Sequence, residues 1–111
     1  MKYKKLKKMK DKKFKRAVGI PRVLFEILVA VLEPPFKERQ RKGGPKPKLA
    51  IEDILLMTLT YYRDYPTFFS LGNTFRIDES NAYRWVTWTE AILSIAFDGI
   101  VDIRLLDEAS E

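Results

Sequence analysis

Polar residues recur along one predicted helix in the C-terminal half of the chain, and their types suit contact with a nucleic acid. At about 100° per residue, Ser80, Arg84 and Thr87 fall on one helical face, with Asn81 and Tyr83 beside them. An arginine can donate two parallel hydrogen bonds to guanine or to phosphate oxygens, and short hydroxyl side chains let backbones approach closely. These five residues are therefore our candidates for contacting bases or adjacent phosphates of double-stranded DNA.

Two helices joined by a short turn would position these side chains. Thr67 can cap a first helix, in which Phe68, Leu71 and Phe75 form a buried stripe. Asp78 ends the turn and can cap the second helix. This is the layout of a helix-turn-helix, in which the second helix carries base-contacting residues near its start. An ordinary helical hairpin inside a bundle, with its arginine merely solvated, is the alternative.

Three apolar stripes predict the helices that surround this motif. The second helix should face the core through Ala82, Trp85, Val86, Thr89, Ile92, Leu93 and Ala96. A supporting helix over residues 49–65 should be buried through Ile51, Ile54, Leu55, Thr58, Leu59 and Tyr62. An earlier helix should be buried through Leu24, Ile27, Leu28 and Val31, in an apolar stripe widened by Val23, Phe25 and Leu32. Pro34-Pro35 should stop this helix.

Composition favours a folded binding domain. The 111 residues are 46% hydrophobic, with no cysteine and no histidine, which excludes disulfides, thiolate chemistry and imidazole-based catalysis. The sequence shows no nucleophile–base pair and no cluster of carboxylates for metal ions, so we expect no catalytic residue, no cofactor and no metal site. The expected fold class is all-α: a small helical bundle containing a helix-turn-helix, with a basic N-terminal tail and a basic Gly/Pro linker.

Charge is distributed unevenly along the chain. Residues 1–48 hold 17 Lys and Arg against four acidic residues, whereas residues 49–111 hold four Arg against eleven acidic residues. A basic end favours a polyanionic partner, since neutralising phosphates dominates nonspecific DNA affinity. A solubilising tail is the alternative.

The predicted linker is itself cationic. Glycines and prolines in residues 36–48 argue against regular structure. A flexible basic arm can lie along a minor groove beside a docked helix, although a plain solvated linker remains open. The residues expected to contact the DNA backbone from this arm are Arg39, Arg41, Lys42, Lys46 and Lys48.

We divide the chain into five parts: a flexible basic tail (1–13), a helical pair (14–35), the arm (36–48), the helix-turn-helix domain (49–98) and a C-terminal tail (99–111). Periodicity leaves residues 99–106 open between a strand and a short closing helix. The apolar run Val23–Leu32 is too short to span a membrane, and Glu-Pro-Pro follows it where a signal peptide would need small residues. We expect a cytoplasmic, nucleoid-associated bacterial protein without a membrane partner.

Residues 41–86 resemble the helix-turn-helix region at the N-terminus of insertion-sequence transposases of the IS5-like, DDE-superfamily kind. The matching features are a basic Gly/Pro arm leading to Leu49, the helix Ile51–Tyr62, Thr67-Phe68-x-x-Leu71, and the turn Phe75-x-Ile77-Asp78-x-Ser80-x-Ala82-x-Arg84. The wider resemblance covers residues 14–97. It implies a module that binds the terminal inverted repeats of its element and delivers a separate endonuclease domain.

Only fifteen residues follow Ala96, too few for such a catalytic domain. We therefore expect no enzymatic activity, as in the first frame of a frameshifted element or a truncated remnant. Besides the element ends, the expected partners are a second copy of the chain or a separate catalytic chain. The competing hypothesis is a helical protein–protein interaction module that binds through Trp88, Phe69 and Tyr61.

Two residues depart from the family pattern. Arg76 stands where a glycine is common in the turn, so the turn either avoids positive φ or imposes strain on Arg76. Glu79 opens the second helix and would repel phosphate unless it contacts a cytosine amino group.

Overall fold

The fold is known from a computed structural model, which describes residues 3–43 and 47–96. Over these residues the secondary structure is entirely helical, as the composition and periodicity predict. The helices are α1 (Tyr3–Leu6), α2 (Asp11–Val18), α3 (Arg22–Arg41), α4 (Ile51–Asp64), α5 (Phe68–Phe75) and α6 (Glu79–Ala96). Residues 99–106, for which a strand or a helix was expected, lie outside the described part, and no described helix is long and apolar enough to cross a membrane.

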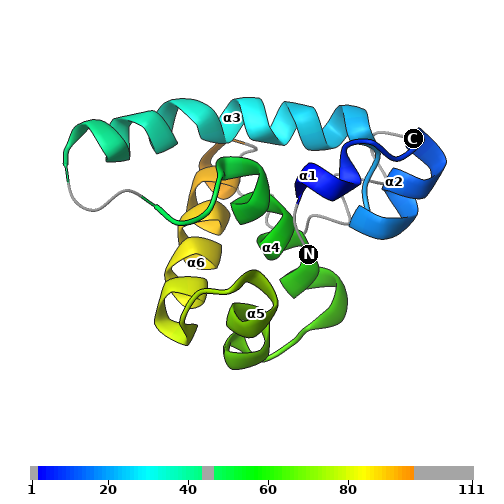
Figure 1. Cartoon of the computed structure of the whole chain (residues 1–111). Coiled ribbons are helices and arrows are strands. Elements are labelled where there is room, and N and C mark those ends of the chain that lie inside the picture. Colours follow the sequence, from blue (N-terminus) through cyan, green and yellow to red (C-terminus); the bar gives the residue numbers. More distant parts are fainter. Residues whose placement is uncertain (1–2, 44–46, 97–111) are drawn as a thin grey trace.

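Helix α4 is the centre of the molecule. Its predicted apolar face is buried through Ile51, Ile54, Leu55, Thr58 and Leu59, whereas Tyr62 is only half-buried. Leu56 and Met57 on its other side are buried as well. A helix that is apolar nearly all round must be covered on every side. Figure 1 shows how: α3 crosses above α4, α5 and α6 lie below and beside it, and α1 and α2 lie at one end.

Helix α3 does not stop at Pro34-Pro35, which corrects our prediction. It continues to Arg41 with both prolines inside it. Proline removes a backbone donor and normally disrupts a helix interior, so tertiary contacts must favour the continuation. Phe36 supplies them: it is 9% exposed, and its ring centroid lies 5.9 Å from that of Trp85 and 6.1 Å from that of Trp88.

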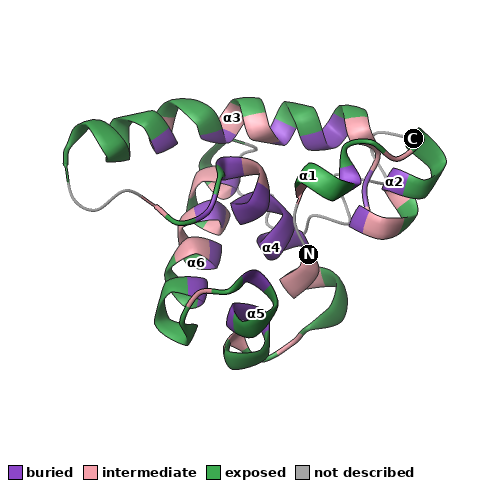
Figure 2. Ribbon diagram, viewed as in Figure 1, coloured by how far each residue is buried: buried purple, intermediate pink, exposed green. Residues whose placement is uncertain are grey.

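The buried side of α3 agrees with the predicted stripe at Leu24, Phe25, Leu28 and Leu32 but not at Ile27 and Val23. It runs through Leu24, Phe25, Leu28, Leu32 and Phe36, a series with spacings of one, three, four and four residues. Figure 2 shows this buried side facing α4 and an exposed side facing away. Because α3 continues past the prolines and Phe36 is buried, the residues that share the helical face of Phe36 are buried as well. Ile27, expected in the core, is therefore 49% exposed, and Val23 is 69% exposed.

Residues 3–13 are folded, whereas we expected a flexible tail over residues 1–13. Leu6 at the end of α1 is only 4% exposed. The backbone N–H of Tyr3 donates to Oδ1 of Asp53 on α4 at 2.8 Å, and the Tyr3 ring stacks on Phe25 with a 5.1 Å centroid distance. Burial, with the charge of Glu26 nearby, raises the pKa of the Tyr3 hydroxyl. These contacts hold the segment against α3 and α4 despite its repelling lysines.

Candidate nucleic-acid interface

Each of the two helices of the motif, α5 and α6, begins with a side-chain cap, and the sequence predicts both caps. Thr67 Oγ1 accepts a hydrogen bond from the backbone N–H of Ser70 at 3.0 Å, which starts α5. Asp78 Oδ1 accepts from the backbone N–H of Asn81 at 2.8 Å, which starts α6. Leu71 and Phe75 are buried and Phe68 is half-buried, so the expected stripe of α5 is confirmed. The second helix is therefore fixed at its first turn.

The backbone of the turn between α5 and α6 is tightly constrained. Arg76 ends α5 in the left-handed region, with φ 60° and ψ 42°. It thus adopts the positive φ for which the family's glycine is suited, at a cost for a residue with a Cβ. Gly72 lies so close to the turn that a Cβ there would fall 2.6 Å from the carbonyl oxygen of Ile77. The close approach of α5 to the turn requires a glycine at this position.

All five recognition-helix candidates are exposed on α6, and within the described residues neither Arg84 nor the Tyr83 hydroxyl makes a side-chain hydrogen bond. The Ser80 hydroxyl and the Asn81 amide donate to the Asp78 carboxylate, both at 3.2 Å. The Thr87 hydroxyl donates to the Tyr83 carbonyl at 2.8 Å. The Arg84 guanidinium therefore has its full set of donors available to a ligand.

The core-facing side of α6 follows its prediction with one exception. Ala82, Val86, Thr89 and Leu93 are buried, and Trp85 and Ile92 are half-buried. Ala96, expected in the core, is exposed because it lies at the end of the helix, one turn beyond the last buried residue.

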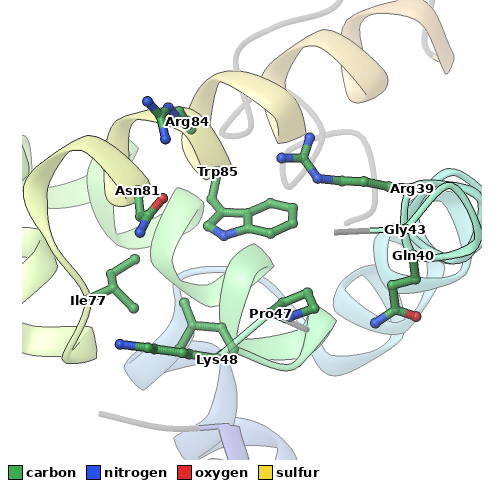
Figure 3. A pocket seen from close by; sticks show the side chains of 10 residues that line it. Arg39, Gln40, Gly43, Pro47, Lys48, Ile77, Asn81, Arg84 and Trp85 are labelled. Carbon is green, nitrogen blue, oxygen red and sulfur yellow. The ribbon is translucent and has the colours of Figure 1, made fainter. Parts of the chain in front are cut away.

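A hollow of about 570 Å³ opens on one side of α6, and three chain segments converge on it. Figure 3 shows Asn81, Arg84 and Trp85 from α6 facing Arg39 and Gln40 from α3, with Pro47 and Lys48 closing the space below. The complete lining is Arg39, Gln40, Gly43, Pro47, Lys48, Leu49, Ile77, Asn81, Arg84 and Trp85. We call this space the basic hollow, because three cations and no carboxylate line it.

Arg39 is held at the rim by an aromatic ring. Its guanidinium carbon lies 4.7 Å from the Trp85 ring centroid, a cation–π distance. Trp85 is in turn packed edge-on against Trp88, with a 5.3 Å centroid distance, and against Phe36. Among the described residues no carboxylate forms an ion pair with Arg39, Lys48 or Arg84. The hollow thus presents three positioned cations, although the charges of Arg84 and Lys48 also act on the nearby Asp78 carboxylate.

The predicted backbone-contacting residues do not act as one flexible arm. Arg39 and Arg41 lie on α3, and Lys42 caps its end. Arg41 is committed to Glu38 through a salt bridge of 2.6 Å, and this hydrogen bond raises its already high pKa. Lys48 lines the basic hollow, whereas Lys46 lies outside the described residues. Of the five, Arg39 and Lys48 are brought to the recognition helix.

The other side of α6 has the opposite charge. A shallower hollow of about 490 Å³ is lined by Phe68, Asp78, Glu79, Ser80 and Tyr83. Hydrogen bonding from the Asn81 backbone N–H lowers the pKa of the Asp78 carboxyl, with further lowering by the Ser80 hydroxyl and the charges of Arg84 and Lys48. Asp78 is therefore held ionised, and the exposed ridge of α6 separates a basic side from an acidic side.

Sequence reasoning missed Trp85 and Gln40 as lining residues of the basic hollow. Trp85 was assigned wholly to the core, but its ring also forms part of the hollow. Gln40 was placed in the linker over residues 36–48, for which no regular structure was expected. The available signal was the spacing from Phe36: residues three and four positions later share its helical face, so Arg39 and Gln40 point toward α6.

The three aromatics of the competing interaction hypothesis do not form one exposed surface. Trp88 is half-buried against Phe36 and Trp85. Tyr61 is half-buried and stacks on Phe68 with a 4.8 Å centroid distance. Phe69 alone of the three is widely exposed, at 63%. We find no specific observation that favours this hypothesis.

Comparison with known proteins agrees with this geometry. Residues 47–98 match a family described as the helix-turn-helix of DDE superfamily endonuclease. The chain is also 39% identical, over 93 residues, to a probable transposase for insertion sequence element IS702 from Microchaete diplosiphon. That match covers 84% of the chain, so it extends well beyond the residues of the helix-turn-helix match. No solved structure matches the chain significantly.

The matched region is a part of a larger protein in the relative. The chain spans about a third of the length of the IS702 transposase, 33%. The family match concerns the helix-turn-helix and not a catalytic domain. Within residues 3–43 and 47–96, no three acidic side chains are grouped as they would need to be to hold a metal ion.

Proposed function

Because the chain belongs to the helix-turn-helix family of the DDE superfamily endonucleases, we propose that it binds duplex DNA with α6 in the major groove. One observation carries this proposal: Arg84, with its donors free, is flanked by Arg39 and Lys48 around one hollow. Arg84 would contact a base edge or an adjacent phosphate, and the other two cations would hold the backbone. Ser80, Asn81, Tyr83 and Thr87 would complete the contact along the exposed ridge.

The charge difference between the two sides of α6 orients the DNA. The basic hollow attracts a phosphate backbone, whereas Asp78 and Glu79 repel one. We therefore place one DNA strand against the basic hollow and leave the acidic side facing bases or solvent. This placement removes the conflict that Glu79 posed at the sequence level, because Glu79 need not lie near a phosphate.

The DNA is, in our proposal, the terminal inverted repeats of an insertion element. The IS702 relative is described as a probable transposase for an insertion sequence element, and in our proposal the helix-turn-helix of this chain makes the contact to the element ends. The described residues themselves would perform no catalysis. A second copy of the chain or a separate catalytic chain would be the protein partner in transposition.

Arg84→Ala tests the base contact. A preferred duplex is first selected from a random pool, and the affinities for it and for a random duplex are measured by fluorescence anisotropy. We expect Arg84→Ala to lower the preference for the selected duplex by about 1–3 kcal/mol. Arg41→Ala is the matched control, because it removes the same charge from a side chain already paired with Glu38. Equal losses on both duplexes would show that Arg84 contacts phosphate alone, and absence of binding at low salt would contradict the proposal.

A further inference from the structure

The lysines at the start of the chain lie on a folded surface, which we call the N-terminal knob (residues 3–18). It consists of α1 and α2, packed against the beginning of α3. Seven of its lysine side chains are exposed: Lys4, Lys5, Lys7, Lys8, Lys10, Lys12 and Lys13. None of them forms an ion pair with a carboxylate of the described residues. The knob therefore presents dense positive charge on an ordered backbone.

Arg22 fixes the shape of the knob. Its Nε donates to Oδ1 of Asp11 at 2.8 Å, its Nη1 donates to the Lys7 carbonyl at 3.0 Å, and its Nη2 donates to the Met9 carbonyl. Its guanidinium carbon also lies 4.3 Å from the Phe14 ring centroid. Asp11, the single acid among residues 3–18, is thus paired with an arginine outside the knob and does not neutralise its lysines.

Buried side chains secure the knob to the core as well. Leu6, Phe14 and Val18 are at most 4% exposed. Phe14 packs edge-on against Phe25 with a 5.5 Å centroid distance, and Tyr3 stacks on the same ring. A flexible lysine tail would lose backbone entropy on binding a polyanion, whereas this segment is already ordered before it binds.

The knob and the basic hollow lie at opposite ends of α3. Figure 1 shows α1 and α2 beside the start of α3, whereas Arg39 and Gln40, which line the hollow, lie near the end of that helix. Helix α3 has 20 residues, which at about 1.5 Å per residue separates the two surfaces by roughly 30 Å. One turn of B-DNA is about 34–36 Å long. The two cationic surfaces are thus spaced for phosphates about one turn apart.

We propose that the N-terminal knob is a second DNA-binding surface, which contacts the phosphate backbone of the same duplex about one helical turn from the basic hollow. This inference rests on the proposed function of α6. It assigns the knob a sequence-independent role: the lysines neutralise phosphates and lengthen the bound site, while α6 selects the sequence.

The test is a double substitution in the knob, Lys7→Gln/Lys8→Gln, measured on two lengths of random DNA. A hairpin-closed duplex of about 6 base pairs spans roughly 20 Å at about 3.4 Å per base pair, well short of the separation between the two surfaces. A duplex of about 30 base pairs reaches both. The matched control is Lys37→Gln/Arg41→Gln, which removes the same charge from side chains paired with Glu33 and Glu38.

On the long duplex we expect the knob variant to bind about tenfold or more weakly at roughly 0.1 M salt, with a log–log salt slope smaller by about 2. On the short duplex its loss should shrink to about twofold, since either surface then binds alone. The control variant should lose less than about threefold on either length. Both variants change exposed side chains only, so circular dichroism should show unchanged folding.

A second variant tests whether the ordered backbone of the knob matters for binding, in addition to the charge of its lysines. Leu6→Ser keeps every lysine but removes a buried anchor of α1, and we expect it to weaken binding to the long duplex. Unchanged affinity of Leu6→Ser would overturn the ordered-surface part of the proposal. If Lys7→Gln/Lys8→Gln lost the same affinity for the short and the long duplex, or lost none for either, the second site would be overturned. The proposed function of α6 would still stand if Arg84→Ala impaired binding. Failure of the unsubstituted protein to bind any duplex would instead reject the proposed function itself.

Discussion

Two arginines near the two ends of α3 make similar aromatic contacts but have different surroundings. Arg22 lies over Phe14 at 4.3 Å, and Arg39 lies over Trp85 at 4.7 Å. Arg22 also donates hydrogen bonds to one carboxylate and two backbone carbonyls. Arg39 has no such acceptor among the described residues. An aromatic contact alone therefore does not identify the role of an arginine.

The difference lies in what remains available to a ligand. The donors of Arg22 are consumed inside the protein, where they order the N-terminal knob. Arg39 is positioned by its ring contact while its donors stay open at the rim of the basic hollow. We therefore assign stability to Arg22 and ligand contact to Arg39, and the following substitutions test that division from the largest expected effect to the smallest.

Phe36→Ala should have the largest effect, because Phe36 anchors the end of α3 that carries Arg39. Removing a buried phenylalanine costs about 3–5 kcal/mol, and we expect about 3 kcal/mol in the free energy of unfolding in urea. The control is Ile27→Ala on the same helix, which is 49% exposed and should cost less than about 1 kcal/mol. Equal costs would mean that the helix beyond the prolines is not held by Phe36.

Arg22→Met and Arg39→Met test the comparison directly. Arg22→Met should lower the free energy of unfolding by about 2 kcal/mol, because it removes charge-assisted hydrogen bonds to Asp11, Lys7 and Met9. Arg39→Met should lower it by only about 0.5 kcal/mol, the value of an exposed cation–π contact.

Arg22→Met and Arg39→Met should also differ in their effects on DNA binding. Arg39→Met should reduce the log–log salt slope by about 1, as expected for one lost phosphate contact. A large loss of stability in Arg39→Met without a change in the salt slope would reverse the roles that we assign to these two arginines.

Arg76→Gly should have a smaller and opposite effect on stability. The left-handed conformation costs about 1–2 kcal/mol for a residue with a Cβ, and glycine avoids that cost at some expense in unfolded-state entropy. We expect the free energy of unfolding to rise by about 0.5 kcal/mol. Thermal and urea unfolding would measure it, and a decrease would show that the Arg76 side chain stabilises the turn through contacts that outweigh its backbone strain.

Asp78→Asn should change how stability depends on pH. The folded protein lowers the pKa of Asp78, so the ionised carboxylate stabilises the fold above its unfolded pKa of about 3.9. That contribution is lost as the pH falls through the lower, folded pKa. Asparagine can still cap α6, so the variant should fold with a weaker decline in stability below about pH 4. If the free energy of unfolding fell equally with decreasing pH in both proteins, the lowered pKa that we assign to Asp78 would be contradicted.

Local rules explain which parts of the fold could be predicted from sequence. The caps at Thr67 and Asp78 depend on side chains only a few residues from their partners, and both were predicted correctly. The continuation of α3 past Pro34-Pro35 depends on Phe36 meeting Trp85 and Trp88, about fifty residues later. Proline rules state a local cost and contain no information about such distant contacts.

The candidate site was predictable to a similar extent. The exposed face of α6 follows from helical periodicity, so the exposure of Arg84 was predicted correctly, whereas its contact with DNA stays a prediction. The convergence of Arg39 and Lys48 on that face depends on the path of α3 and of the chain after it, which periodicity does not describe. The ordering of the first residues likewise depends on Arg22 and Asp53, which lie outside the lysine-rich segment.

The most direct test of the central claim is to map DNA contact onto the chain by NMR. Backbone amide shifts of the ¹⁵N-labelled protein are followed while a duplex is added at low salt. We expect the largest changes at residues 79–87 of α6 and at residues 39–43 and 47–49 around the basic hollow. Shifts concentrated instead around Phe69 and Tyr61, with the exposed face of α6 unchanged, would contradict our account and favour an aromatic interaction surface.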